Sequence, residues 1–144
     1  VEADAFFAKH PTKLLAADEL LTAIIVPAPQ QREGSAYVKQ GRDKTDEALA
    51  SAAARVLLAD DGKIAAARVV VGAVRPLPQK FDAPAALVGA APSDESLAAA
   101  AKVIADDVTV SDNYLAAADY RRELVSALVE QALTLAVERA GGAK

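Results

Sequence analysis

The chain has 144 residues, of which 53% are hydrophobic and 25% are charged, and its formal net charge is −4. This length and composition fit one globular domain with a single hydrophobic core. An acidic chain without a long basic segment is a poor match for nucleic acid or for an anionic membrane surface, so we expect neither as a partner.

The absence of cysteine and the presence of a single histidine exclude several kinds of catalytic and metal site. Cysteine and methionine are absent, and His10 is the only histidine. Disulfides, thiolate metal ligands, thiol nucleophiles and histidine metal clusters are therefore excluded within the chain. His10 lies in the polar stretch AKHPTK without a recognisable nucleophile or orienting group, so we interpret it as a surface residue. We expect no catalytic residue and no metal ligand in this chain.

Targeting and anchoring segments are not recognisable. No apolar run approaches the roughly 20 residues of a membrane-spanning helix, and no basic-then-apolar signal opens the chain. We therefore expect a cytoplasmic protein without a membrane span. Because methionine is absent, Val1 is not a translation start as written: either an initiator was removed or the chain is part of a longer polypeptide.

The first half of the chain predicts four strands. Residues 20–26 form a short apolar run bounded by a turn and two prolines, and residues 36–40 alternate between apolar and polar. Alanine in residues 49–59 favours a helix. However, DDG follows and then a β-branched run, which is typical of a hairpin. We therefore predict strands at 49–59 and 63–74 that turn at Asp60–Gly62; ADDGKIA lacks the spaced oxygen ligands of a calcium loop.

The second half predicts helices. Residues 75–84 form a proline-rich connector. The next segment, PSDESLAAAAKVIADD, has Ser93 as a candidate N-cap and acidic residues in its first turn, which favours a helix. Residues 116–139 form the strongest predicted helix, with Leu124, Leu128 and Leu135 near its apolar face, and Gly141 is a natural stop. Strands first and helices last indicate an α+β fold with helices on one face of an antiparallel sheet.

Two groups of polar residues are candidate ligand contacts. Lys39 shares a strand face with Tyr37, which fits either a solvated sheet face or the edge of a cofactor site. Arg121 and Arg122 open the last helix, where two cations are unfavourable unless they contact a partner. For the arginines we favour packing or salt bridging over ligand binding. No phosphate-binding loop or dinucleotide fingerprint is present.

Four segments, in order, resemble one family: DELLTAIIVPAP, GSAYVKQGR, ADDGKIAAARVVVGAV and ADYRREL. They look like the C-terminal part of the FAD-binding (medium) subunit of the molybdenum hydroxylases, the family of carbon monoxide dehydrogenase and xanthine dehydrogenase. The glycine-rich FAD-binding segments of that subunit precede this region. The resemblance covers nearly the whole chain. It implies a small antiparallel sheet of three or four strands backed by about three helices.

The resemblance also implies an organisation and a function. Residues 1–144 would form a single domain, with a lead-in segment and first strand at 1–30 and a sheet followed by helices at 35–144. This domain would wall the FAD site together with the upstream FAD-binding region, and would dock to iron–sulfur and molybdopterin subunits. Electrons would pass from two-iron two-sulfur clusters to FAD. Lys39 and Leu21 match a lysine and a leucine that the family places beside FAD.

Three positions depart from the family pattern. Lys9 stands where relatives often have glycine, Asp43 stands where they usually have a second basic residue, and Glu47 replaces an apolar residue. An alternative interpretation is therefore a stand-alone interaction or scaffold domain that keeps the fold without flavin. An unrelated small enzyme is disfavoured because the sequence offers few candidate nucleophiles.

Overall fold

The computed structural model describes residues 1–9 and 13–141, so His10 lies outside the described residues. The chain is an α+β fold, as predicted, and its described residues form a four-stranded sheet and three helices. In chain order the elements are α1 (Ala3–Phe6), β1 (Glu33–Gln40), β2 (Ala50–Leu58), β3 (Ile64–Gly72), β4 (Gln79–Asp82), α2 (Asp94–Asp107) and α3 (Ala118–Ala140).

The sheet is antiparallel throughout, and its spatial order is β1-β2-β3-β4. The predicted hairpin of β2 and β3 is confirmed, with Ala54 opposite Val69. Its turn contains Gly62 at φ 80°, a backbone conformation that glycine adopts without steric cost. β2 has a hydrogen-bonded neighbour on each side, and this pairing overrides the helix preference of its alanines.

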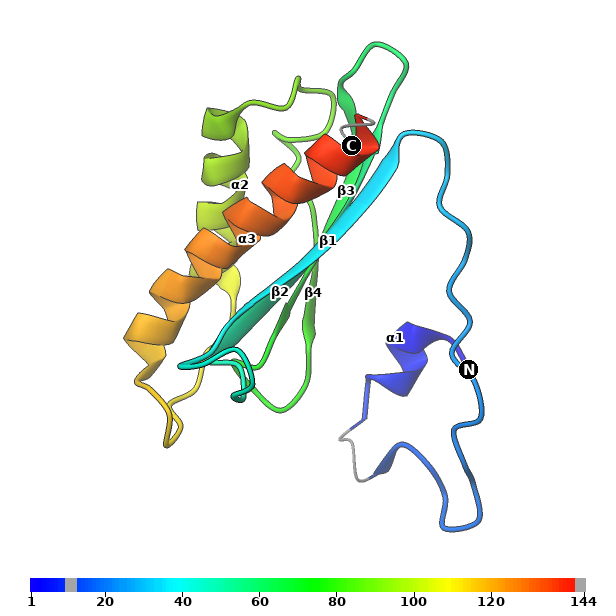
Figure 1. Cartoon of the computed structure of the whole chain (residues 1–144), viewed down its shortest axis with the longest axis vertical. Coiled ribbons are helices and arrows are strands. Elements are labelled where there is room, and N and C mark those ends of the chain that lie inside the picture. Colours follow the sequence, from blue (N-terminus) through cyan, green and yellow to red (C-terminus); the bar gives the residue numbers. More distant parts are fainter. Residues whose placement is uncertain (10–12, 142–144) are drawn as a thin grey trace.

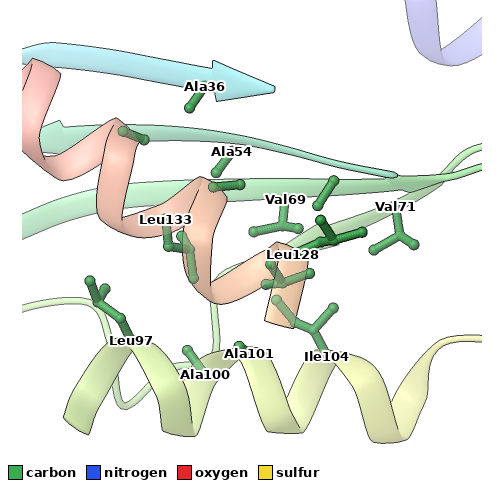
Figure 2. Packing of buried hydrophobic residues seen from close by; sticks show 14 of the residues in the cluster. Ala36, Ala54, Val69, Val71, Leu97, Ala100, Ala101, Ile104, Leu128 and Leu133 are labelled. Carbon is green, nitrogen blue, oxygen red and sulfur yellow. The ribbon is translucent and has the colours of Figure 1, made fainter. Parts of the chain in front are cut away.

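Two of the helices, α2 and α3, cover one face of the sheet (Figure 1). α3 packs directly on β1 and β2, and α2 packs on α3 (Figure 1). The apolar stripe of α2 is buried, and Figure 2 shows it directed towards α3 and the sheet. The short helix α1 lies on the opposite side of the sheet, where Asp4 pairs with Lys80 of β4 (Figure 1). The stripe on α2 consists of Leu97, Ala100, Ala101 and Ile104.

Small residues allow α3 to approach the sheet closely. A Cβ atom at Gly34 of β1 would lie 2.0 Å from the carbonyl oxygen of Ala136 and 2.5 Å from the backbone nitrogen of Ala140. The two backbones are therefore in direct contact. Ala36 and Ala54 are buried on the face of the sheet that α3 covers (Figure 2).

The prediction of a strand at residues 20–26 is wrong. This segment has no regular secondary structure, and its apolar side chains are exposed, with Ile25 at 90%. An apolar run indicates a segment suited to burial, but a strand also needs a hydrogen-bonding neighbour, and β1 pairs only with β2 within the described residues. Figure 1 shows residues 13–32, which precede β1, running apart from the sheet.

Two smaller differences concern the connector and the last helix. β4 was not predicted, because its four residues follow Pro76 and Pro78 in a segment that resembles a loop. In α3 the side chains of Leu124 and Leu135 are only half-buried. The fully buried face of the helix is rotated from the predicted one and includes Leu133.

Among the described residues, no helix is long and apolar enough to cross a bilayer.

Candidate functional site

Lys39 lies near the end of β1, opposite Ser51 of β2. The predicted alternation is confirmed, since Ala36 is buried whereas Tyr37 and Lys39 are exposed on the other face of the sheet. The Lys39 ammonium donates a hydrogen bond to the carbonyl oxygen of Asp46, at 3.2 Å. An ammonium has three N–H donors, so this tether leaves donors available for a ligand.

A surface hollow of about 440 Å³ begins at Lys39 and follows the chain after β1. Three of its side chains are cationic and one, Asp43, is anionic, so the hollow carries net positive charge. This donor set fits a ligand that presents acceptor oxygens or negative charge, as flavin does. We call this feature the Lys39 hollow. It is lined by Lys39, Gln40, Gly41, Arg42, Asp43 and Lys44.

The β1–β2 connection, residues 41–49, is fastened to the loop that precedes α3. A guanidinium N–H of Arg42 donates to the carbonyl oxygen of Leu115, at 3.3 Å. The Tyr114 hydroxyl donates to a carboxylate oxygen of Glu47, at 2.5 Å. Glu47, which departs from the family pattern, thus has a specific polar partner at the molecular surface.

Arg121, in the first turn of α3, is 1% exposed, and its guanidinium is enclosed by backbone carbonyls. Its Nε donates to the carbonyl oxygen of Leu49 at 2.9 Å, and its two terminal nitrogens donate to the carbonyls of Ser111 and Ala73. Burial lowers the pKa of Arg121 from its ordinary value, and the charge of Asp112 opposes that shift.

Arg122, the next residue of α3, links this helix to α2. Its Nη1 donates to the carbonyl oxygens of Ala105 and Val108, at 3.0 and 2.8 Å. These carbonyls lie at the C-terminal end of α2, where a cation is favourable. Both arginines therefore make the packing contacts expected from the sequence. The sequence signal was the presence of two cations at a helix N-terminus, but it did not reveal which carbonyls they bind.

Leu21 lies in the linker between α1 and β1, with 55% of its surface exposed. Figure 1 shows this linker leaving the sheet, and the Lys39 hollow is lined only by residues 39–44. The structure therefore does not bring Leu21 and Lys39 into one pocket. Within residues 1–9 and 13–141, no group of three acidic or histidine side chains is arranged to hold a metal ion.

Known proteins share both the sequence and the fold. Residues 35–136 match the family model of the CO dehydrogenase flavoprotein C-terminal domain. The nicotine 6-hydroxylase medium subunit of Paenarthrobacter nicotinovorans is 31% identical over 140 residues, which cover 96% of this chain and 48% of that protein. The chain therefore spans about half the length of this curated relative.

Solved structures agree with this assignment. A carbon monoxide dehydrogenase from Hydrogenophaga pseudoflava matches with a TM-score of 0.72 and 30% identity, covering 79% of this chain and 40% of the other. Quinoline 2-oxidoreductase from Pseudomonas putida 86 matches with a TM-score of 0.69 and 26% identity, covering 75% and 38%. The resemblance noted in the sequence is confirmed, and this chain belongs to the CO dehydrogenase flavoprotein C-terminal domain family.

Proposed function

We propose that this chain is the C-terminal domain of the FAD-containing subunit of a molybdenum-dependent hydroxylase, and that it forms one wall of the flavin site. Support comes from the family match over residues 35–136 and from a relative named as the medium subunit of nicotine 6-hydroxylase. Residues 1–144 act as one unit beside an upstream FAD-binding region, with residues 1–30 as its lead-in segment.

The partners of this domain are an iron–sulfur subunit and a molybdopterin subunit of the same complex. FAD, when bound, accepts electrons that arrive from two-iron two-sulfur clusters and passes them on. The chain itself supplies side chains that bind and orient the flavin, and the redox metals are held by the partner subunits. The substrate that is oxidised is selected in the molybdenum subunit.

Lys39 is the residue that carries the flavin contact. Its ammonium sits at the rim of a hollow with net positive charge and uses one hydrogen bond to hold its position on Asp46. The other N–H groups would donate to flavin or ribityl oxygens, and the positive charge would favour electron density on the flavin. Leu21 adds an apolar contact when the exposed linker packs against the upstream region.

Replacing Lys39 in the complete subunit tests this role. Lys39→Met removes the charge and the donors but keeps an unbranched chain, so it should lower the flavin midpoint potential or weaken FAD retention without changing the thermal unfolding temperature. Lys63→Met is the matched control, because Lys63 pairs with Asp61 in the β2–β3 turn, outside the Lys39 hollow.

The result also separates the two interpretations of the family. If flavin content, potential and reoxidation rate of Lys39→Met all match the wild type, Lys39 is only a surface lysine. If the folded wild-type subunit holds no flavin at all, the domain is the non-flavin interaction or scaffold module.

A further inference from the structure

We propose that Arg121 is a positioning residue that holds the β1–β2 connection, and through it the Lys39 ammonium, at the rim of the Lys39 hollow. The proposal rests on the function proposed above for Lys39. Arg121 itself is buried beneath this region and does not line the hollow.

The first part of the argument is the arrangement around the guanidinium. Arg121 donates to carbonyls of Leu49, Ala73 and Ser111, which precede it by 72, 48 and 10 residues. These carbonyls belong to the chain segments just before β2, just after β3 and before α3. No carboxylate forms a salt bridge with Arg121 within residues 1–9 and 13–141. Carbonyl dipoles therefore compensate the buried charge, and one side chain joins three separate segments.

The second part is the path from Arg121 to Lys39. Leu49, whose carbonyl binds Arg121, donates its own backbone N–H to the carbonyl of Gln40 at 2.7 Å. Gln40 directly follows Lys39 on β1. The carbonyl that holds the Lys39 ammonium belongs to Asp46, three residues before Leu49. The backbone of Gln40 beside Lys39 and the Asp46 carbonyl that holds the Lys39 ammonium are therefore both linked to Leu49, the residue whose carbonyl Arg121 binds.

The third part is the chemistry of the residue. A guanidinium is planar and presents five N–H donors in a fixed fork, whereas an ammonium is a compact point charge on a flexible stem. Only the guanidinium can reach three carbonyls in different directions with fixed geometry. Replacing it leaves the carbonyl of the buried Leu49 without its donor, which is costly, and the connection relaxes to recover a partner.

Acylation of lysine by an amine-reactive ester, followed by peptide mass spectrometry, measures the freedom of the Lys39 ammonium without reference to flavin. The experiment uses the complete subunit as wild type, Arg121→Met and Arg121→Lys. We expect the Lys39 rate, divided by that of Lys63, to rise about two- to tenfold in both variants, the range for losing one hydrogen bond. If Arg121→Met does not fold, Arg121→Lys, which keeps the charge, decides the question.

Arg122→Met is the matched control. It removes a neighbouring guanidinium that also binds backbone carbonyls, but those carbonyls belong to the end of α2. Its unfolding temperature should fall while the relative rate at Lys39 stays at the wild-type value. A Lys39 rate that is unchanged in the Arg121 variants, or raised equally by Arg122→Met, overturns the proposal.

A double-mutant cycle separates this proposal from the flavin function of Lys39. If Arg121 acts through Lys39, Arg121→Lys shifts the flavin midpoint potential in the wild type but not in the Lys39→Met background. An equal shift in both backgrounds overturns the positioning role. If Lys39→Met leaves the flavin content, potential and reoxidation rate unchanged while acylation still responds to Arg121, Arg121 positions Lys39 and the flavin contact proposed for Lys39 is wrong.

Discussion

Glu33 and Arg55 form a two-point ion pair on the open face of the sheet: Arg55 Nε and Nη2 donate to the two carboxylate oxygens of Glu33 at 2.6 and 2.7 Å. These hydrogen bonds, with one from the backbone N–H of Gln30, lower the pKa of Glu33 to about 2. Since the folded pKa is depressed, the pair stabilises the fold above the unfolded pKa, and this stabilisation is lost as the pH falls towards 2.

The pair predicts a specific pH dependence. Glu33→Gln should be less stable than the wild type at pH 7, and the difference between the two should shrink as the pH falls from about 4.5 to 2. Thermal unfolding at several pH values measures this difference. Glu130→Gln, on the exposed side of α3, is the control and should track the wild type. Parallel curves for wild type and Glu33→Gln would show that the pair contributes nothing.

Tyr114 and Glu47 predict a titration in the alkaline range. The Glu47 carboxylate accepts the phenolic hydrogen and repels a phenolate, so the pKa of Tyr114 is raised above its ordinary value. Ultraviolet titration of the tyrosines should show one group shifting to lower pH in Glu47→Gln. In a Tyr114→Phe background, the same Glu47→Gln change should leave the titration curve unaltered. A titration curve that is identical with and without the Glu47 carboxylate, when Tyr114 is present, contradicts the contact.

Gly34 predicts a steric limit between β1 and α3. Gly34→Ala forces a Cβ into the backbone of Ala136 and Ala140, which should destabilise the fold by about 1–3 kcal/mol or more. Urea unfolding measures the loss. Gly141→Ala is the matched control: its added Cβ would lie 3.5 Å from the carbonyl oxygen of Val137, an ordinary contact. Equal stability of the two variants would mean that β1 and α3 are not packed this closely.

Flavin binding by the isolated chain should be weak. The sequence has no glycine-rich phosphate cradle, and the Lys39 hollow offers only part of a flavin site. Titrating FAD into the 144-residue chain while following flavin fluorescence tests this. Stoichiometric binding at micromolar affinity or tighter would contradict the prediction and would assign the whole flavin site to this chain.

The local signals in the sequence predicted most of the fold. The DDG turn and the β-branched second arm indicated the β2–β3 hairpin, and Ser93 does cap α2, accepting a hydrogen bond from the backbone N–H of Ser96. These features depend on neighbours in sequence. The run at 20–26 has the same apolar character as a strand but lacks a pairing strand, and pairing is a property of distant segments.

The site was less predictable for the same reason. Alternation placed Lys39 on an exposed face, but the tether to Asp46 depends on how the connection folds back. Arg121 was visible as an unusual cation at a helix start, yet its three carbonyl partners come from segments 10 to 72 residues away. These three carbonyls come together only when the chain has folded.

Two sets of contacts fix α3 against the sheet, one near each end of the helix. Gly34 leaves no space at the C-terminal end, and Arg121 fastens the N-terminal end to three carbonyls. Between these two sets of contacts, the sheet presents the methyl side chains of Ala36 and Ala54 to the helix (Figure 2). A branched residue at Ala54 would lift the middle of the helix and tilt Arg121 away from the sheet end. If Arg121 positions Lys39 as proposed, the geometry around Lys39 therefore also depends on the volume of side chains buried between α3 and the sheet.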